Sequence, residues 1–227
     1  MQTVQINKNN AVKSLKTIAA LSVTAAMALC MTSCSLVSGD KSARNGKELY
    51  KEGQYPEAFA SFTEAEEKGL KNFREAELYY YMGNCCMKSE DWEKAIEYQL
   101  KSLESDPEYF GAWVSLGVAY RKTGDRDKAL ECYETALQYD PMTAESVPLY
   151  ISLGMVYIEM RKPISAVEYL EKAQYLSPNQ ADIYAYLAVA YKMEIEPEKS
   201  EEAYKKAQEM GYSKMEDIDR LLGEIGR

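Results

Sequence analysis

The chain has 227 residues and no histidine. Histidine is the usual general base at neutral pH and the commonest metal ligand, so every histidine-dependent catalytic or metal-binding mechanism is excluded. No two cysteines have the CxxC spacing typical of zinc and redox sites. Carboxylates such as Glu131, Glu134 and Glu168 fall at helix positions that we expect to be solvated. The sequence therefore predicts a protein that is not an enzyme and that has no catalytic residue, no metal site, no cofactor and no small-molecule substrate.

Basic residues are outnumbered, with 27 lysines and arginines against 36 aspartates and glutamates. Removal of residues 1–33 deletes three lysines and no acid, which leaves a net charge of −12. A surface of this sign repels phosphate backbones and anionic lipid headgroups. We expect no nucleic-acid partner, and any attachment to a membrane must come from something other than surface charge.

The N-terminal segment has the pattern of an export signal. Residues 1–16 carry three lysines and no acid, and Thr17 to Met31 is a mostly apolar run of 15 residues. Such a run is too short for a comfortable membrane span of about 20 residues. The charged start followed by a short apolar stretch is typical of a secretory signal peptide. The alternative is a signal anchor that is not cleaved and carries an incidental cysteine.

The apolar run ends in Met31-Thr32-Ser33-Cys34, which resembles a bacterial lipobox. The resemblance implies a lipoprotein signal peptide over 1–33 and a diacylglycerol, with a palmitate-type acyl chain, on Cys34. It also implies an exported protein anchored by lipid alone to the bacterial cell membrane, or to the outer membrane in a cell with two membranes. Residues 34–40 would form the lipidated tether. Its six residues after Cys34 reach about 20 Å when fully extended.

The rest of the chain consists of internal sequence repeats. Small residues recur at steps of 37, 34, 37 and 34 residues, and a second series follows the same steps. The first series consists of Gly46, Gly83, Gly117, Gly154 and Ala188, and the second of Ala58, Ala95, Ala129, Ala166 and Ser200. A period near 34 indicates a repeat made of two helices and a turn.

The third repeat has the spacing Trp113-x2-Leu116-Gly117-x2-Tyr120 followed by Ala129-x3-Tyr133-x2-Ala136-x4-Pro141. This resembles the tetratricopeptide consensus throughout, and the fourth repeat resembles it nearly as well. The second repeat departs from it at Gln99, where an aromatic residue is usual. The resemblance implies an all-α fold, an α-solenoid in which five helix–turn–helix repeats over 41–212 stack as a right-handed superhelix, followed by a capping helix over 213–227.

Several residues predict where the helices end. Gly53 and Gly124 are placed to stop first helices, and Asp106-Pro107 and Ser177-Pro178 to stop second helices. Ser213 with Glu216 predicts a capping box at the start of the last helix. We expect that helix to seal the final repeat, and the alternative is that it docks onto a partner.

The family resemblance implies that the first helices of the repeats line an inner, concave groove. Next to their packing face these helices carry a second stripe of side chains with i, i+4, i+7 spacing. The predicted peptide-binding residues are Tyr80, Asn84, Met87, Val114, Val118, Arg121, Ile151, Met155, Ile158 and Val189. The alternative is that the curvature of the superhelix packs these residues against one another. A clamp for a peptide carboxylate is disfavoured, because Tyr80 and Val114 stand where it would need lysines.

Two function classes follow. The first is a membrane-tethered scaffold that binds a peptide or partner subunit, through an apolar or amphipathic segment, in the groove during envelope assembly. The second is a constitutive structural subunit of an envelope complex that binds through convex or end surfaces.

The cysteines do not help to choose between these two function classes. Cys85 and Cys86 are adjacent and cannot form an unstrained disulfide, Cys86 occupies a packing position, and Cys132 lies beside the packing stripe of a second helix.

Overall fold

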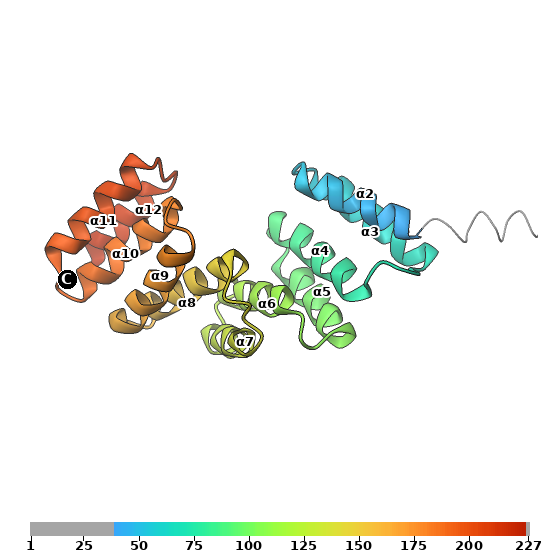
Figure 1. The fold of residues 1–227 in the computed structure, drawn as a ribbon, viewed down its shortest axis with the longest axis horizontal. Coiled ribbons are helices and arrows are strands. Elements are labelled where there is room, and N and C mark those ends of the chain that lie inside the picture. Colours follow the sequence, from blue (N-terminus) through green and yellow to red (C-terminus); the bar gives the residue numbers. More distant parts are fainter. Residues whose placement is uncertain (1–38, 226–227) are drawn as a thin grey trace, which may run out of the picture. The chain divides into compact units, whose positions relative to one another are not determined.

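The computed structural model describes residues 39–225. Within this range the chain forms eleven α-helices and one short 3-10 helix, with no strand (Figure 1). The helices are 10 to 14 residues long and are joined by short turns. They form consecutive antiparallel pairs, so the all-α repeat fold predicted from the sequence is confirmed.

Two compact units divide the chain after Arg74. The first unit contains α2 (Gly39–Lys51) and α3 (Tyr55–Lys68). Its core consists of Ala43, Ala58, Phe62 and Ala65, which are fully buried. Gly46 allows the two helices to approach closely, because a Cβ atom there would lie 2.9 Å from Cε1 of Phe62.

The second unit contains four further helix pairs and a final helix. The first helix of each pair is α4 (Glu75–Lys88), α6 (Phe110–Lys122), α8 (Val147–Glu159) or α10 (Ala181–Met193). The second helix is α5 (Trp92–Ser105), α7 (Arg126–Gln138), α9 (Pro163–Leu176) or α11 (Pro197–Glu209), and α12 (Met215–Glu224) follows. The 3-10 turn η1 (Ala144–Ser146) precedes α8.

Close contact within each pair depends on the small residues of the repeat. A Cβ atom at Gly117 would lie 2.4 Å from the ring of Tyr133, and one at Gly154 would lie 2.5 Å from Leu170. Both large side chains are fully buried. The glycine and the large residue are therefore complementary across the pair, as close packing of helices requires.

Local sequence sets the helix ends. The side chains of Asp91 and Asp125 cap α5 and α7 by accepting hydrogen bonds from the third backbone N–H of each helix. Helix α5 ends at Ser105 and α9 at Leu176, immediately before the Asp-Pro and Ser-Pro pairs. These ends agree with the sequence-based predictions.

The last helix packs against α10, and Ile218 is 1% exposed at their contact. It therefore covers the end of the final pair, as expected of a capping helix. The predicted capping box is wrong. Helix α12 begins at Met215 after Lys214, and no side chain caps it. The backbone N–H of Asp217 bonds instead to the carbonyl of Lys214, so the first turn is closed without Ser213.

The predicted signal peptide over 1–33, Cys34 and all of the tether except its last two residues lie outside the described residues. They stay predictions. Among the helices of residues 39–225, none is both long enough and apolar enough to cross a membrane.

Candidate peptide-binding face

All ten predicted binding residues lie on the first helices of the second unit. These helices contact one another in order, α4 with α6, α6 with α8, and α8 with α10. They therefore present one continuous surface, which we call the first-helix face. It is defined by the predicted residues Tyr80, Asn84, Met87, Val114, Val118, Arg121, Ile151, Met155, Ile158 and Val189.

The ten side chains divide evenly between buried and half-buried. The most exposed of the buried set is Ile158 at 8%, and the others are Asn84, Val114, Ile151 and Val189. The half-buried set consists of Tyr80, Met87, Val118, Arg121 and Met155. Val114, Ile151, Ile158 and Val189 belong to one apolar core cluster with residues of first and second helices, and Asn84 is bonded to Gln99 of α5. Only the half-buried set can offer surface to a partner.

Tyr80 and Asn84 are held by polar and aromatic contacts inside the array. The Tyr80 ring lies edge-on to Tyr109, with centroids 5.2 Å apart. Gln99 Nε2 donates to the Tyr80 carbonyl at 3.2 Å and to Asn84 Oδ1 at 3.1 Å. Gln99 is fully buried, so the residue that departs from the aromatic consensus instead fixes Asn84. Burial raises the pKa of the Tyr80 hydroxyl above 10, which keeps it neutral.

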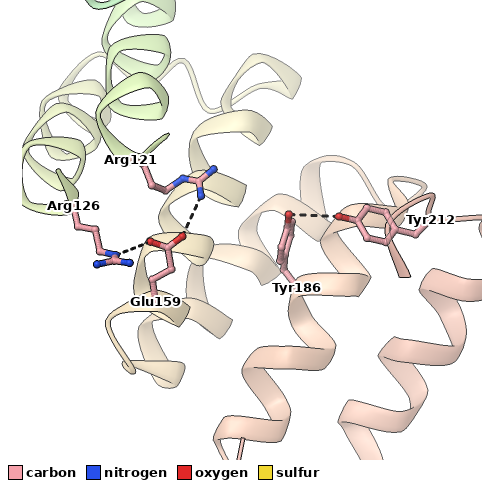
Figure 2. Close-up of polar contacts among 5 residues, drawn as sticks. All are labelled: Arg121, Arg126, Glu159, Tyr186 and Tyr212. Atoms are coloured by element: carbon pink, nitrogen blue, oxygen red, sulfur yellow. Dashed lines mark hydrogen bonds and ion pairs between the residues drawn. The ribbon is translucent and has the colours of Figure 1, made fainter. Parts of the chain in front are cut away.

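Arg121 takes part in a charged cluster at the C-terminal ends of α6 and α8 (Figure 2). Its Nη1 atom lies 3.1 Å from Glu159 Oε1, and Arg126 Nε lies 2.9 Å from Glu159 Oε2. The side chains are 11%, 30% and 57% exposed for Arg121, Glu159 and Arg126. One carboxylate thus joins the third repeat to the fourth, and the cluster keeps one uncompensated positive charge.

Two tyrosines that sequence reasoning missed lie farther along the same unit. The hydroxyl of Tyr212 is 3.5 Å from that of Tyr186 on α10, and their rings meet edge to face (Figure 2). Burial raises the pKa of Tyr186, and Arg121 and Asp182 act on the same hydroxyl with opposite signs. The charges of Arg121 and Asp182 are therefore both close enough to the Tyr186 hydroxyl to affect its pKa. The repeat period gave no signal for Glu159, since it falls 38 residues after Arg121 and the step between these two repeats is 37.

Buried polar atoms without a hydrogen-bond partner occur on this part of the molecule. Among the described residues they include Arg121 Nε and Asp182 Oδ1. Leaving such atoms unpaired costs free energy, so each favours a ligand or water that completes it. Both atoms are buried, so a partner could reach them only if neighbouring side chains moved.

The three cysteines of residues 39–225 are free and buried. Burial raises the pKa of the Cys85 and Cys132 thiols to about 12 and that of Cys86 to about 11. A thiol with such a pKa is almost wholly protonated at neutral pH, so it is a poor nucleophile. These residues fill space in the helix contacts.

Family models for the tetratricopeptide repeat match three successive stretches of the chain, residues 76–109, 111–142 and 147–180. These are the second, third and fourth helix pairs. Among curated proteins, the anaphase-promoting complex subunit CDC16 of Saccharomyces cerevisiae is 28% identical over 121 residues, 50% of this chain. The Hsp70-Hsp90 organizing protein 1 of Glycine max is 30% identical over 106 residues, 47% of this chain.

The chain spans only 14% of the length of the first of these relatives and 18% of the second. Among solved structures, a thermophilic TPR protein of Thermus thermophilus superposes with a TM-score of 0.62 at 23% identity. That match covers 82% of this chain and 97% of the other. The repeat spacing, the helix pairs and the matched models agree, and residues 76–180 of the chain are tetratricopeptide repeats.

Proposed function

We propose that the protein is a membrane-tethered interaction scaffold that holds a peptide or partner subunit on its first-helix face. The observation that carries this proposal is the half-buried set on that face, in which Val118 and Met155 leave apolar surface beside the Arg121–Glu159 pair. Apolar surface next to fixed polar groups is the usual composition of a binding site. Both relatives are named for working with other proteins, one as a complex subunit and one as an organizing protein.

The chemistry of this face favours an amphipathic segment. Val118 and Met155 would contact its apolar side chains, and methionine adapts well to different partners. Arg121 and Glu159, whose side chains are 11% and 30% exposed, would contact its polar side chains. The net charge of −12 without residues 1–33 disfavours nucleic acid as the partner.

The tether rests on the lipobox-like sequence that ends at Cys34. A lipid there would place the scaffold on the outer side of the cell membrane, or on the outer membrane of a cell with two membranes. A scaffold at that place is suited to the assembly of an envelope structure. The tether and this role are proposals from the sequence.

The test is a double variant, Val118→Glu with Met155→Glu, in the full-length protein. Both side chains are half-buried, so the melting temperature should fall by only a few degrees, about 2–4 °C for each kcal/mol lost. In a complex, each carboxylate would be buried against apolar surface at a much higher cost. Partners crosslinked to the wild type in its native membrane should therefore be lost from the variant.

A matched control is Ile164→Glu on α9, where the side chain is 72% exposed and away from the first helices. This control should retain the partners and the melting temperature. Retention of the partners by the double variant would contradict binding at the first-helix face. A collapse of its melting temperature would show that Val118 and Met155 belong to the core.

A second function is favoured by the burial of five of the ten predicted residues. Because packing inside the unit covers half of the stripe, the protein could instead serve as a constitutive structural subunit of an envelope complex. It would then bind through convex or end surfaces. In that case the double variant keeps its partners, while changes on second helices remove them.

A further inference from the structure

The fifth repeat contains a cavity of about 680 Å³ above α10, between α9 and α11. Helix α10 packs against both of these helices, which lie beside it (Figure 1). The volume of this cavity is within the range of about 300–1,000 Å³ that is typical of ligand pockets. We call it the outer slot. Its apolar and aromatic lining residues are Tyr184, Leu187, Tyr191 and Ala203, and its charged lining residues include Lys199 and Lys206.

Two earlier repeats show what fills the equivalent place. In the second repeat Tyr98 stacks on Tyr79, with centroids 6.4 Å apart and an interplanar angle of 23°. Lys101 Nζ lies 4.9 Å from the centroid of the Tyr98 ring and 2.9 Å from Glu97. A tyrosine of the second helix thus lies on a tyrosine of the first helix, with a lysine above it.

The fourth repeat has a related arrangement with a different stacking partner, because Tyr150 is the equivalent of Tyr79 and Tyr157 is the equivalent of Cys86. Tyr169 stacks on Tyr157, with centroids 5.7 Å apart and an angle of 8°, and lies 6.2 Å from the Tyr150 ring. Lys172 Nζ is 4.6 Å from the centroid of the Tyr169 ring and 2.8 Å from Glu168. Both repeats therefore read Glu-Tyr-x-x-Lys along the second helix.

In the fifth repeat this motif becomes Glu202-Ala203-x-x-Lys206. The glutamate, the lysine and the two first-helix tyrosines of the fourth repeat are kept, as Tyr184 and Tyr191, whereas the second repeat has Cys86 at the position of Tyr191. The stacking tyrosine is replaced by Ala203, and Lys199 stands where the fourth repeat has Ser165. Ala203 lines the cavity, which therefore lies beside the position of the missing ring.

The walls of the outer slot are fixed without a ligand. The Tyr184 hydroxyl donates to the Pro178 carbonyl at 2.8 Å, and the Tyr191 hydroxyl donates to Glu171 Oε1 at 2.9 Å. Leu187, which is 1% exposed, forms the floor. A site whose side chains are already ordered loses less entropy when it binds.

In the third repeat, both the lysine and the stacking tyrosine are replaced by other residues. Cys132 and Thr135 stand at their positions, and Cys132 is 5% exposed in a cluster with Trp113 and Leu116. In the first repeat the two positions hold Ser61 and Glu64. Only the fifth repeat keeps the lysine without the ring that it would cover.

We propose that the outer slot binds an aromatic side chain, tyrosine in the first instance, of a partner protein. The incoming ring would stack on Tyr184 as Tyr98 stacks on Tyr79, with the Lys206 ammonium over its face. It would also meet Lys199, whose ammonium lies 5.4 Å from the centroid of the Tyr191 ring. The site lies on second helices and on the packing side of α10. It is therefore independent of the first-helix face and of the function proposed for it.

The test uses N-acetyl-L-tyrosinamide as the probe and the full-length protein with labelled methyl groups. Titration should shift the Leu187 and Ala203 methyl resonances in a saturable way at millimolar concentration, and N-acetyl-L-leucinamide should bind several-fold more weakly. The Ala203→Tyr variant should fill the slot from within. It should keep or raise the melting temperature, and its Leu187 resonance should no longer respond to the probe.

Two further variants test the proposal if Ala203→Tyr folds poorly. Ala203→Ser leaves the slot open and should bind as the wild type does, while Lys206→Ala should weaken binding by about two- to five-fold. Absence of a shift at Leu187 in the wild type would overturn the proposal, as would an unchanged response in a folded Ala203→Tyr protein. Tyr175 on α9 is 87% exposed, so its ring could enter the slot of a second copy. Self-association that both Ala203→Tyr and Tyr175→Ser abolish would overturn the choice of occupant.

Discussion

One residue in each repeat adopts the left-handed backbone conformation at the turn between its two helices. The φ angles are 79° at Gly53, 58° at Glu90, 91° at Gly124, 57° at Arg161 and 65° at Ile195. The spacing of these positions is the repeat spacing itself, 37, 34, 37 and 34 residues. Because the helix pair can close only through this turn, the fold imposes the conformation whatever residue stands there.

Ile195 is the least suitable residue in this series, since a β-branched side chain clashes with its own backbone at positive φ. Its side chain is 87% exposed, so its removal loses little packing. We predict that Ile195→Gly stabilises the protein by about 0.5–1 kcal/mol, after allowance for the greater freedom of glycine in the unfolded chain. Thermal unfolding followed by circular dichroism measures the effect.

The matched control is the reverse change at the equivalent turn, Gly124→Ile. A Cβ atom there would meet no other atom within 4 Å, so the change tests the backbone conformation alone. It should cost about 1–2 kcal/mol. Equal melting temperatures for the wild type and both variants would show that this turn carries no strain.

These turns also show the limit of prediction from residues. Gly53 and Gly124 could be predicted as helix stops because glycine favours positive φ. Glu90, Arg161 and Ile195 give no such signal, and their conformation follows only from the repeat register. The first-helix face has the same limit. Its stripe was visible as a spacing, but the burial of Ile151 and Val189 depends on how closely neighbouring first helices approach, which spacing alone does not determine.

At the scale of elements, two of the four repeat steps are 37 residues long instead of 34. In each of these two, the longer turn between repeats is bonded to an aspartate side chain. In the first unit, the Asp40 carboxylate accepts hydrogen bonds from the backbone N–H groups of Lys71, Asn72 and Phe73. In the second unit, Asp140 accepts from the N–H of Met142 and from the hydroxyls of Ser146 and Tyr150. A longer turn exposes more backbone donors, and each carboxylate satisfies several of them.

Asp40 makes the stability of the first unit depend on pH. The N–H of Lys71, followed by those of Phe73 and Asn72, lowers the pKa of Asp40 from 3.8 to about 2. A carboxylate with a lowered pKa stabilises the folded state fully above its ordinary pKa, and this contribution is lost as the pH falls from 3.8 towards 2. We predict that Asp40→Asn speeds amide exchange at Lys71, Asn72 and Phe73 above pH 4, and that its difference from the wild type shrinks as the pH falls through the folded pKa of about 2.

Hydrogen–deuterium exchange at single-residue resolution measures this effect. The control is Glu67→Gln, an exposed carboxylate near the end of α3 in the same unit. It should leave the three amides unchanged at every pH. Equal exchange in the wild type and Asp40→Asn at pH 6 would contradict a stabilising role for the carboxylate.

Pairs such as Asp40 with Lys71 and Arg121 with Glu159 were not predicted from the sequence. Their partners are 31 and 38 residues apart, and each contact depends on where one helix pair places its ends relative to the next segment. The helix pairs themselves could be predicted, because their signals are local and recur five times. The polar contacts that join the segments occur once each, so no periodicity reveals them.

At the scale of the whole molecule, the second unit offers two different surfaces, the first-helix face and the outer slot. One combines apolar and charged groups on first helices, and the other is an aromatic cavity of the fifth repeat. A scaffold with two such surfaces can contact two segments of one partner or two partners together, which raises the effective concentration of the second contact. A fixed attachment to a membrane would further limit where those partners meet.

That attachment depends on Cys34 and leads to the last prediction. The residues from Ser35 to Asp40 span at most about 20 Å, so a lipid on Cys34 would hold the first unit close to the bilayer. One acyl chain binds membranes only marginally, whereas a cysteine with a diacylglycerol carries two chains and is held stably. We predict that Cys34→Ser leaves an unprocessed precursor or releases the protein from the membrane fraction. Radiolabelled palmitate should enter the wild type and not the variant.

Cys30→Ser is the matched control, because Cys30 lies in the same apolar run but is preceded by the bulky Leu29 rather than by small residues. It should be labelled and fractionate as the wild type does. Label retained by Cys34→Ser and lost from Cys30→Ser would move the attachment four residues upstream. Label absent from the wild type, with the whole chain still in the membrane fraction, would instead support the uncleaved signal anchor, in which residues 17–31 rather than a lipid hold the repeats at the membrane.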